Sequence, residues 1–288
     1  MSKYILLLAL LLAGGVSGAQ GLYIKVSGGY ALPISSQAMT QDGTLILNDN
    51  GEGSLVNKRN KGSYGAGTTL NSSVGYKFSP FIGADLSFSY LIGKEFSGKT
   101  TFETPFINGY TSEKTQAKGF LLAPSILFMA GTGKVRPYAT LGLALGKFEI
   151  LTQNDTLLSV DVGDVAQTLQ SHLETKFTGD LTFGFRAGIG IDYNITNRIG
   201  VFAEGVINTM NYYPKESEIT VYTASGRNVL PELTTSERKV VFKESITLTS
   251  TGGEVEMDNT KPREELQESL PVNNFTFSFG VKVLFGWD

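Results

Sequence analysis

The feature that most constrains this chain is a strict alternation of apolar residues with small or polar ones, which recurs in eight separate segments. In the clearest of them, 81–92, apolar residues fill the even positions from Ile82 to Ile92, and Gly83, Asp85, Ser87 and Ser89 lie between them. Because successive side chains of a strand point to opposite faces, this pattern predicts β-strands with one apolar face. The expected strands lie at about 22–30, 64–78, 81–92, 119–130, 137–150, 180–193, 198–213 and 274–285.

The connections between these strands switch between very short and long. Short turns are expected at Ser79-Pro80, 131–134 and 194–197. The long connections are about 31–63, 93–118, 151–179 and 214–273. Transmembrane β-barrels of the bacterial outer membrane have short periplasmic turns and long extracellular loops. The chain is therefore predicted to be all-β, an eight-stranded antiparallel up-and-down transmembrane β-barrel whose four long connections are extracellular loops.

The two faces of the strands differ in a way that separates a membrane barrel from a soluble barrel or sandwich. The apolar face carries large Leu, Ile and Phe residues, whereas the other face carries mostly Gly, Ser, Thr and a few charges. A soluble barrel hides its apolar face inside. The interior of an eight-stranded barrel is narrow, so the small and polar face fits the inside and the bulky face fits lipid.

Two further features bear on this interpretation. The fourth expected strand is apolar on both faces and contains Pro124, which makes it the weakest of the eight. Aromatic residues near the strand ends are typical of membrane interfaces. Those expected near the periplasmic rim are Tyr76, Phe78, Phe81, Tyr193, Phe285 and Trp287, and those near the outer rim are Tyr30, Tyr90, Tyr212 and Phe275.

The N-terminus predicts export. Lys3 precedes an apolar run from Tyr4 to Ala13, and Ser17-Gly18-Ala19 supplies small residues for cleavage. The run is too short to span the hydrocarbon of a membrane. We therefore expect a signal peptide at 1–19 and an outer-membrane barrel domain at 20–288, in a Gram-negative bacterium.

Composition excludes several classes of site. The chain has no cysteine, which rules out disulfides, thiolate catalysis and a lipid-modified N-terminal cysteine. A net charge of −3 argues against a nucleic-acid partner. One histidine and no cysteine leave little for a zinc site, so neither a metal nor a cofactor is expected. An acidic run at Glu254, Glu256 and Asp258 fits a solvated surface better than calcium.

Charged residues on the small and polar face are expected to form an interior polar network. Counting back from a tight turn with Asp192 opposite Arg198 sets Arg186 opposite Glu204, which predicts an ion pair between them. Closure of the first strand on the eighth makes neighbours of two lysines. The network comprises Lys25, Asp85, Arg186, Glu204 and Lys282. Its two interpretations are a salt-bridge gate in a narrow pore and a filled, non-conducting interior.

The histidine offers a weak case for an enzyme. His172 follows Ser171 in a segment, 164–174, whose Val165, Leu169 and Leu173 predict a short amphipathic helix in the third outer loop. Adjacent residues of a helix point about 100° apart, so they make a poor nucleophile and base. No catalytic residue is therefore assigned, and the chain is predicted not to be an enzyme.

The last loop is the longest and the best candidate for a partner. Segments 219–222 and 239–242 alternate like strands and predict a hairpin above the membrane. Range 214–273 holds seven Lys and Arg against eleven Asp and Glu, a net of −4. That charge suits a surface-protein or matrix partner, or bridging by divalent cations. The alternative is a loop that only shields the protein among lipopolysaccharide.

Residues 197–205 resemble the penultimate strands of small eight-stranded outer-membrane proteins of the OmpA-transmembrane-domain, OmpX and opacity-protein type. The stretch 212–215 and the loop after it resemble outer-membrane barrels of Bacteroidota. Such proteins end on an aromatic residue used by the barrel-assembly machinery, whereas this chain ends Phe285-Gly286-Trp287-Asp288. The resemblance implies recognition through the C-terminal strand, with membrane lipid and lipopolysaccharide as neighbours.

These observations favour a non-enzymatic outer-membrane barrel with a structural or surface-interaction role through its loops. The alternatives are a narrow porin or channel, a lipid A-modifying enzyme and a soluble lipid-binding barrel.

Overall fold

The computed structural model of the protein describes residues 21–48, 50, 52–162, 165–247, 250–251, 254–255 and 258–285. The expected signal peptide, 1–19, and the expected rim residue Trp287 lie outside them.

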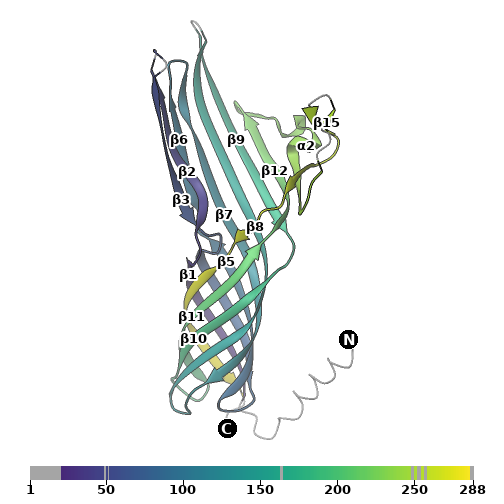
Figure 1. Cartoon of the computed structure of the whole chain (residues 1–288). Coiled ribbons are helices and arrows are strands. Elements are labelled where there is room, and N and C mark those ends of the chain that lie inside the picture. Colours follow the sequence, from purple (N-terminus) through teal and green to yellow (C-terminus); the bar gives the residue numbers. More distant parts are fainter. Residues whose placement is uncertain are drawn as a thin grey trace.

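Eight strands pair antiparallel in a closed ring, the lower part of the molecule in Figure 1. In ring order they are β1 (Leu22–Pro33), β4 (Gly67–Lys77), β5 (Ile82–Gly93), β7 (Ile107–Met129), β8 (Val135–Val162), β10 (Thr182–Asn194), β11 (Ile199–Tyr212) and β19 (Asn274–Phe285). β19 pairs with β1 from Leu22 opposite Phe285 to Pro33 opposite Asn274, and this pairing closes the ring. The eight predicted strands and the barrel are confirmed.

The proline in the fourth predicted strand is accommodated in β7. Pro124 lies opposite Leu86 of β5. On the other side, the pairing of β7 with β8 runs from Leu122 opposite Leu145 to Ser125 opposite Gly142 and skips the two residues between. Because proline has no backbone N–H to donate, it fits where the ladder is interrupted.

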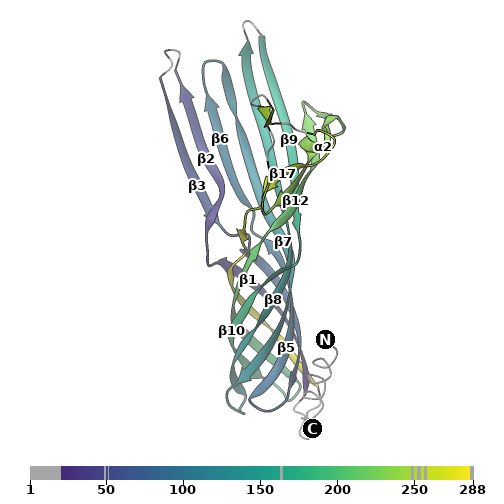
Figure 2. The same ribbon diagram turned by 45° about the vertical axis from the view of Figure 1, so that its right-hand side comes forward.

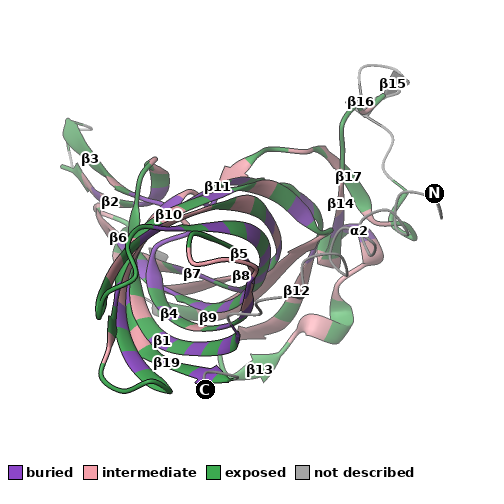
Figure 3. Cartoon of the chain, turned by 90° about the horizontal axis from the view of Figure 1, so that it is seen from below, coloured by how far each residue is buried: buried purple, intermediate pink, exposed green. Residues whose placement is uncertain are grey.

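Side chains of the ring alternate between buried and exposed, which appears as purple and green stripes along the strands in Figure 3. The exposed set is apolar, with Phe183 73%, Ile189 70% and Phe279 70% exposed. Exposing such an apolar band to water would cost free energy, whereas contact with lipid hydrocarbon would not. Ring closure also bonds every strand to two neighbours, the condition for a sheet inside hydrocarbon. The barrel therefore spans a membrane.

Beyond one end of the barrel, the long connections continue as strands and form an open sheet, which we call the wall (Figures 1 and 2). Across the wall the pairing order is β3–β2–β6–β7–β8–β9–β12–β14–β17, in which β2 with β6 and β14 with β17 are parallel. The new strands are β2 (Gln37–Leu47), β3 (Gly53–Gly62), β6 (Phe96–Glu103), β9 (Val165–Gly179), β12 (Pro214–Ala224), β14 (Lys239–Lys243) and β17 (Arg263–Leu266).

Short elements complete the last connection. They are β13 (Arg227–Asn228), the 3-10 helix η1 (Leu230–Glu232), α2 (Thr235–Arg238), β15 (Ser250–Thr251), β16 (Glu254–Val255) and β18 (Leu270–Pro271). In the described ranges no helix is both long and apolar enough to cross a membrane.

The predicted helix at 164–174 is wrong, because residues from Val165 onward form β9. This strand pairs with β8 from Val165 opposite Val162 to Thr178 opposite Glu149. The three apolar residues of the predicted helix, Val165, Leu169 and Leu173, are four apart. A spacing of four is even, so it puts residues on one face of a strand as well as one face of a helix. The spacing alone therefore did not separate the two structures.

The predicted hairpin in the last loop exists, with a different register. β12 and β14 pair antiparallel through Glu216–Glu218 and Lys239–Val241. On its other edge, β12 pairs with β9, and Ile219 lies opposite Thr175.

Tyr212 does not belong to an outer-rim aromatic girdle, so that expectation is wrong. It is on the inward face of β11 and fully buried.

Inside the barrel, toward the wall, a group of apolar side chains forms a layer that we call the apolar layer. Phe148 lies at its centre and is 5% exposed, and its ring meets the ring of Tyr212 edge-on at 5.9 Å between centroids. The other buried members are Ala31, Leu91, Ala117, Leu121, Ala123, Ala144, Ile150, Met210 and Val272. These residues come from β1, β5, β7, β8, β11 and the connection before β19, so the layer joins five strands of the ring to the last connection.

Phe148→Ala is expected to lower the free energy of unfolding by about 3–5 kcal/mol, the usual cost of deleting a buried phenylalanine side chain. Reversible urea unfolding in lipid vesicles measures it. Phe183→Ala is the matched control, because that ring faces lipid and its loss leaves no interior cavity. Equal effects of the two substitutions would contradict the inward placement of Phe148.

Candidate functional site

The barrel interior between the apolar layer and the short turns holds a band of charged and hydroxyl side chains, which we call the polar layer. Four of the five predicted network residues are buried there: Lys25 is 6%, Asp85 7%, Arg186 6% and Lys282 0% exposed. Glu204 is half-buried. Their inward positions follow from the two-residue alternation of strands β1, β5, β10, β11 and β19.

The predicted neighbours Lys25 and Lys282 lie directly opposite each other across the closure of β1 on β19. The positive charge of Lys282 is balanced, because its Nζ forms an ion pair with Asp192 of β10. Both partners are buried, at 0% and 4% exposure of their side chains. An ion pair inside a narrow barrel offsets the cost of removing both charges from water only when the contact is close, as this one is.

Asp85 is a hydrogen-bond acceptor for three hydroxyl groups. Tyr23 donates to its Oδ2 at 2.8 Å and Ser73 to the same atom at 3.0 Å, while Ser87 donates to Oδ1 at 2.8 Å. Two of these donors come from β1 and β4, so the carboxylate joins three adjacent strands. A buried carboxylate satisfied in this way does not need a cation beside it.

Lys25 is held by aromatic rings. Its Nζ lies 4.1 Å from the ring centroid of Tyr138 and 4.8 Å from that of Phe202. Attraction of a cation to an aromatic face is stronger where water is excluded. Tyr138 is itself fixed, because it lies so close to Gly190 that an added Cβ there would come within 2.4 Å of its ring. A glycine is therefore required next to the tyrosine.

The predicted ion pair between Arg186 and Glu204 is wrong. Arg186 lies opposite Asn208 and Glu204 opposite Gly190. The guanidinium donates from Nη1 to Asn208 Oδ1 at 3.3 Å. Glu204 instead accepts hydrogen bonds from Tyr138 at 2.9 Å and Ser278 at 3.2 Å.

The error lies in the turn between β10 and β11. The prediction centred this turn on Ile195, with Asp192 opposite Arg198, whereas in the structure Asn194 pairs with Gly200. The Thr196 hydroxyl accepts hydrogen bonds from the backbone N–H of Arg198 at 3.2 Å and of Ile199 at 2.9 Å. This capped turn has four connecting residues, 195–198, as many as the expected turn at 194–197, but it lies further along the sequence. Its centre moves by two residues, so every cross-strand partner moves by four.

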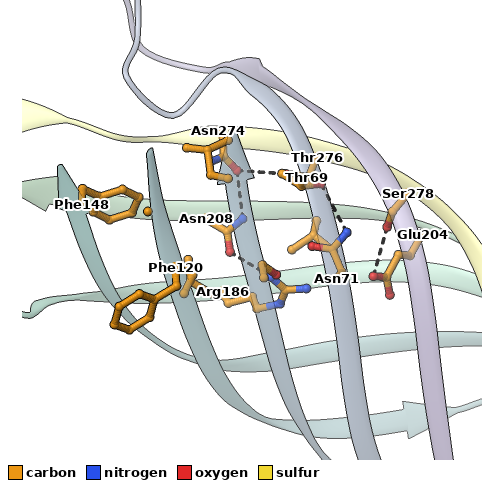
Figure 4. Close-up of a pocket in the computed structure, with 15 residues that line it drawn as sticks. Thr69, Asn71, Phe120, Phe148, Arg186, Glu204, Asn208, Asn274, Thr276 and Ser278 are labelled. Atoms are coloured by element: carbon orange, nitrogen blue, oxygen red, sulfur yellow. Dashed lines mark hydrogen bonds between the residues drawn. The ribbon is translucent and has the colours of Figure 1, made fainter. Parts of the chain in front are cut away.

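Arg186 adjoins two small cavities inside the barrel, and Figure 4 shows the side chains around the first. Their volumes are about 30 Å³ and 20 Å³, and both are lined by Arg186 and Glu204. A water molecule needs about 10–15 Å³ of such space, so each cavity has room for one or two. Above the first, Asn208 donates to Asn274 at 2.9 Å, and Thr276 donates to the same oxygen at 3.1 Å (Figure 4).

Sequence reasoning missed several members of the polar layer. Asp192, Tyr23 and Tyr138 are buried there and carry the contacts described above, and Lys77 is buried beside the ring of Tyr23. All four occupy the inward phase of their strands, so the alternation that found Lys25 could have found them.

The histidine lies in β9, a strand of the wall, and not in the polar layer. His172 of β9 is directly opposite Asp155 of β8, and its Nδ1 is 2.6 Å from Asp155 Oδ1. Its Nε2 is 3.4 Å from Glu174 Oε1. Ser171 precedes it on the strand and therefore points to the opposite face. In the described ranges, no group of three His, Cys, Asp or Glu residues could hold a metal ion.

Asp192→Asn is expected to destabilise the barrel by about 3–5 kcal/mol, because it leaves the buried Lys282 ammonium without its counter-charge. A urea titration measures the change in the free energy of unfolding. The folded fraction at each urea concentration is read from gel migration of samples before and after boiling. The double variant Asp192→Leu with Lys282→Met removes both charges and is expected to restore most of the loss. A single variant within about 0.5 kcal/mol of the parent would show that the pair contributes nothing.

The hydrogen bond to Asp155 raises the pKa of His172 above its ordinary value, and Glu174 acts in the same direction. A group with a raised folded pKa stabilises the fold fully below its unfolded pKa of about 6.5, and the effect is lost as pH rises through the folded pKa. The amides of the β8–β9 hairpin should therefore be better protected at pH 5.5 than at pH 8.5, when each exchange rate is compared with the intrinsic rate of an unfolded chain at the same pH.

As the chain has one histidine, its imidazole NMR signal titrates without overlap. Asp155→Asn should lower that pKa and flatten the pH dependence of amide protection relative to the intrinsic exchange rate. An unchanged titration in Asp155→Asn would contradict the contact.

The chain matches no protein-family model and none of the curated proteins compared with it. Several solved structures are similar to it, and three of them are described here. Neisserial surface protein A is 15% identical, with 93% of this chain and 100% of that chain covered and a TM-score of 0.40. Ail, the attachment invasion locus protein of Yersinia pestis, is 13% identical, with 92% and 99% covered and a TM-score of 0.31.

The third is the outer membrane protease OmpT from Escherichia coli, which is 8% identical, with 92% and 97% covered and a TM-score of 0.34. Likenesses this distant do not establish a shared activity, and none bears on the Bacteroidota-type resemblance. Strand pairing and the apolar outer surface establish the class on their own: this chain is an eight-stranded antiparallel transmembrane β-barrel with a sheet that projects from one end.

Proposed function

We propose that this chain is a non-enzymatic β-barrel of the outer membrane of a Gram-negative bacterium, which acts at the cell surface through its wall. The observation that carries the proposal is the contrast between a filled barrel and a large projecting sheet. Short turns are typical of the periplasmic end of such barrels and long connections of the extracellular end. The wall would then stand outside the cell and the short turns would face the periplasm.

The packing of the barrel argues against a channel. Phe148, Met210 and Tyr212 lie across the lumen in the apolar layer, and each is at most 5% exposed. Below them, the two cavities lined by Arg186 and Glu204 have room for only a few water molecules. A barrel of eight strands is just wide enough for side chains to fill it. Ions would have to cross both layers, so a structural or binding role is favoured over conduction.

The surroundings of His172 argue against a hydrolase. Each ring nitrogen faces a carboxylate, Asp155 at 2.6 Å and Glu174 at 3.4 Å. A general base needs a free nitrogen within reach of a nucleophile. The neighbouring Ser171 lies on the other face of the strand, so a lipid A-modifying or proteolytic mechanism through this pair is disfavoured.

The wall offers a surface for a protein or matrix partner. Among the described residues its first strand, β3, pairs only with β2, so the backbone groups of its other edge are open. Leu55 is 62% and Val56 65% exposed there. Open strand edges and exposed apolar side chains are features of protein-binding surfaces. The last connection, 214–273, supplies the opposite edge, β17. Membrane lipid, lipopolysaccharide and, for β19, the barrel-assembly machinery are further proposed partners.

Single-channel recording in a planar bilayer tests the filled barrel. The refolded protein is expected to be silent, and deletion of the β2–β3 hairpin, 37–62, should leave it silent because the seal lies within the barrel. Gel migration before and after boiling verifies that both proteins are folded. Reproducible openings that change in Arg186→Ala would contradict the proposal and favour a gated pore through the polar layer.

A further inference from the structure

Strand β3 leaves one edge of the wall open. It pairs with β2 along its whole length, and among the described residues no strand pairs with its other edge. Leu55 and Val56 are adjacent on β3, so their side chains point to opposite faces of the sheet. They are 62% and 65% exposed. A partner that covers both must reach both faces at once, as a strand added to the edge does.

Charges along this edge are divided between the two ends of the strand. β3 runs from the far end of the wall toward the barrel (Figure 2). Glu52 directly precedes it, whereas Lys58, Arg59 and Lys61 lie in its half nearer the barrel. All four are exposed, and none forms an ion pair with another described residue. Lysine on an edge strand ordinarily discourages pairing. An edge that is acidic at one end and basic at the other can still complement a copy of itself that runs the opposite way.

The backbone restricts how two such edges can meet. The N–H and C=O groups of a strand point to a given edge at every second residue, so two identical edges bring together residues that are both odd-numbered or both even-numbered. The register centred on Leu55 puts that residue opposite its own counterpart and Val56 opposite Ser54. In the same register Lys58 lies opposite Glu52, and two-fold symmetry forms this pair twice. Moving the centre by one residue in either direction puts an uncharged residue opposite Lys58.

We propose that β3 pairs antiparallel with β3 of a second copy of this chain, in the register centred on Leu55. Opposite charges directly across an antiparallel pair favour pairing, and like charges oppose it. The two leucines meet at the centre, and the two pairs of Lys58 with Glu52 fix the register on either side. The surface is therefore isologous, which means that both copies contribute the same residues.

The direction of β3 determines where the second copy lies. Because the strands are antiparallel, the two barrels lie at opposite ends of the joined sheet. Two molecules inserted the same way in one membrane have β3 strands that run in the same direction, so the pairing joins copies in two apposed membranes. This inference rests on the proposed surface role of the wall and names its partner.

A single cysteine tests the register, because the chain has none of its own. Directly opposite residues of an antiparallel pair have Cα atoms about 4.5–5.5 Å apart, within the range of a disulfide. Leu55→Cys is expected to oxidise to a dimer in detergent, which non-reducing denaturing gels detect. Ser54→Cys is the matched control, because this adjacent exposed residue lies opposite Val56 and not opposite its counterpart. Equal cross-linking of the two variants would indicate random collision and overturn the proposal.

Charge reversal tests the ion pairs. Glu52→Lys and Lys58→Glu each put like charges opposite one another twice, so each variant alone should dimerise at least about tenfold more weakly than the parent. An equimolar mixture of the two restores both pairs and should dimerise like the parent. Sedimentation velocity in detergent measures the dimer. Arg59→Glu changes the net charge as Lys58→Glu does but has no charged residue opposite it, so it should weaken the dimer much less.

Vesicles test the arrangement in apposed membranes. Vesicles that carry the parent protein should aggregate, and those that carry Glu52→Lys should aggregate only with those that carry Lys58→Glu. Failure of the mixed variants to pair, or equal weakening by Arg59→Glu and Lys58→Glu, would overturn the proposal. A parent protein that stays monomeric but is silent in bilayer recordings would contradict this pairing and leave the filled, non-conducting barrel intact.

Discussion

Closure of the strand ring is the constraint on which the rest of this structure depends. A sheet in hydrocarbon must bond every backbone N–H and C=O within the chain, because no water is present to do so. The pairing of β1 with β19 meets that condition along the full length of both strands. Once the ring is closed, each residue has a fixed inward or outward direction, and the composition of the two faces follows from that direction.

Inward residues must then satisfy one another in a narrow space. The carboxylate of Asp85 takes hydroxyl donors, Lys282 takes a carboxylate, and Lys25 takes aromatic faces. These are three different physical solutions to the same problem of a polar group away from water. The apolar layer avoids this problem, because the Tyr212 hydroxyl is the one side-chain polar group among its buried members. The result is a rigid, filled cylinder that is suited to carrying a wall more than to conducting ions.

Much of this fold could be predicted from the sequence because lipid and interior impose opposite demands on alternate residues. Period-two alternation located all eight barrel strands, and closure alone placed Lys25 beside Lys282. The register of Arg186 could not be predicted, because the turn that the Thr196 hydroxyl caps is centred two residues later in the sequence than the one assumed. The strands of the wall gave a weak signal, because neither of their faces is in lipid. In β9, a spacing of four fits both a strand and a helix.

The most direct test of this account is a disulfide between the first and last strands. Ile24 and Val283 are direct cross-strand partners that both face lipid, and the chain has no cysteine to interfere. Paired residues in antiparallel strands have Cα atoms about 4.5–5.5 Å apart, within the range that a disulfide spans. Ile24→Cys with Val283→Cys should oxidise fully in the folded barrel and give a circular protein on denaturing gels. Failure to oxidise, together with oxidation of Ile24→Cys paired with a cysteine at Val201 of β11, would contradict the closed eight-stranded ring.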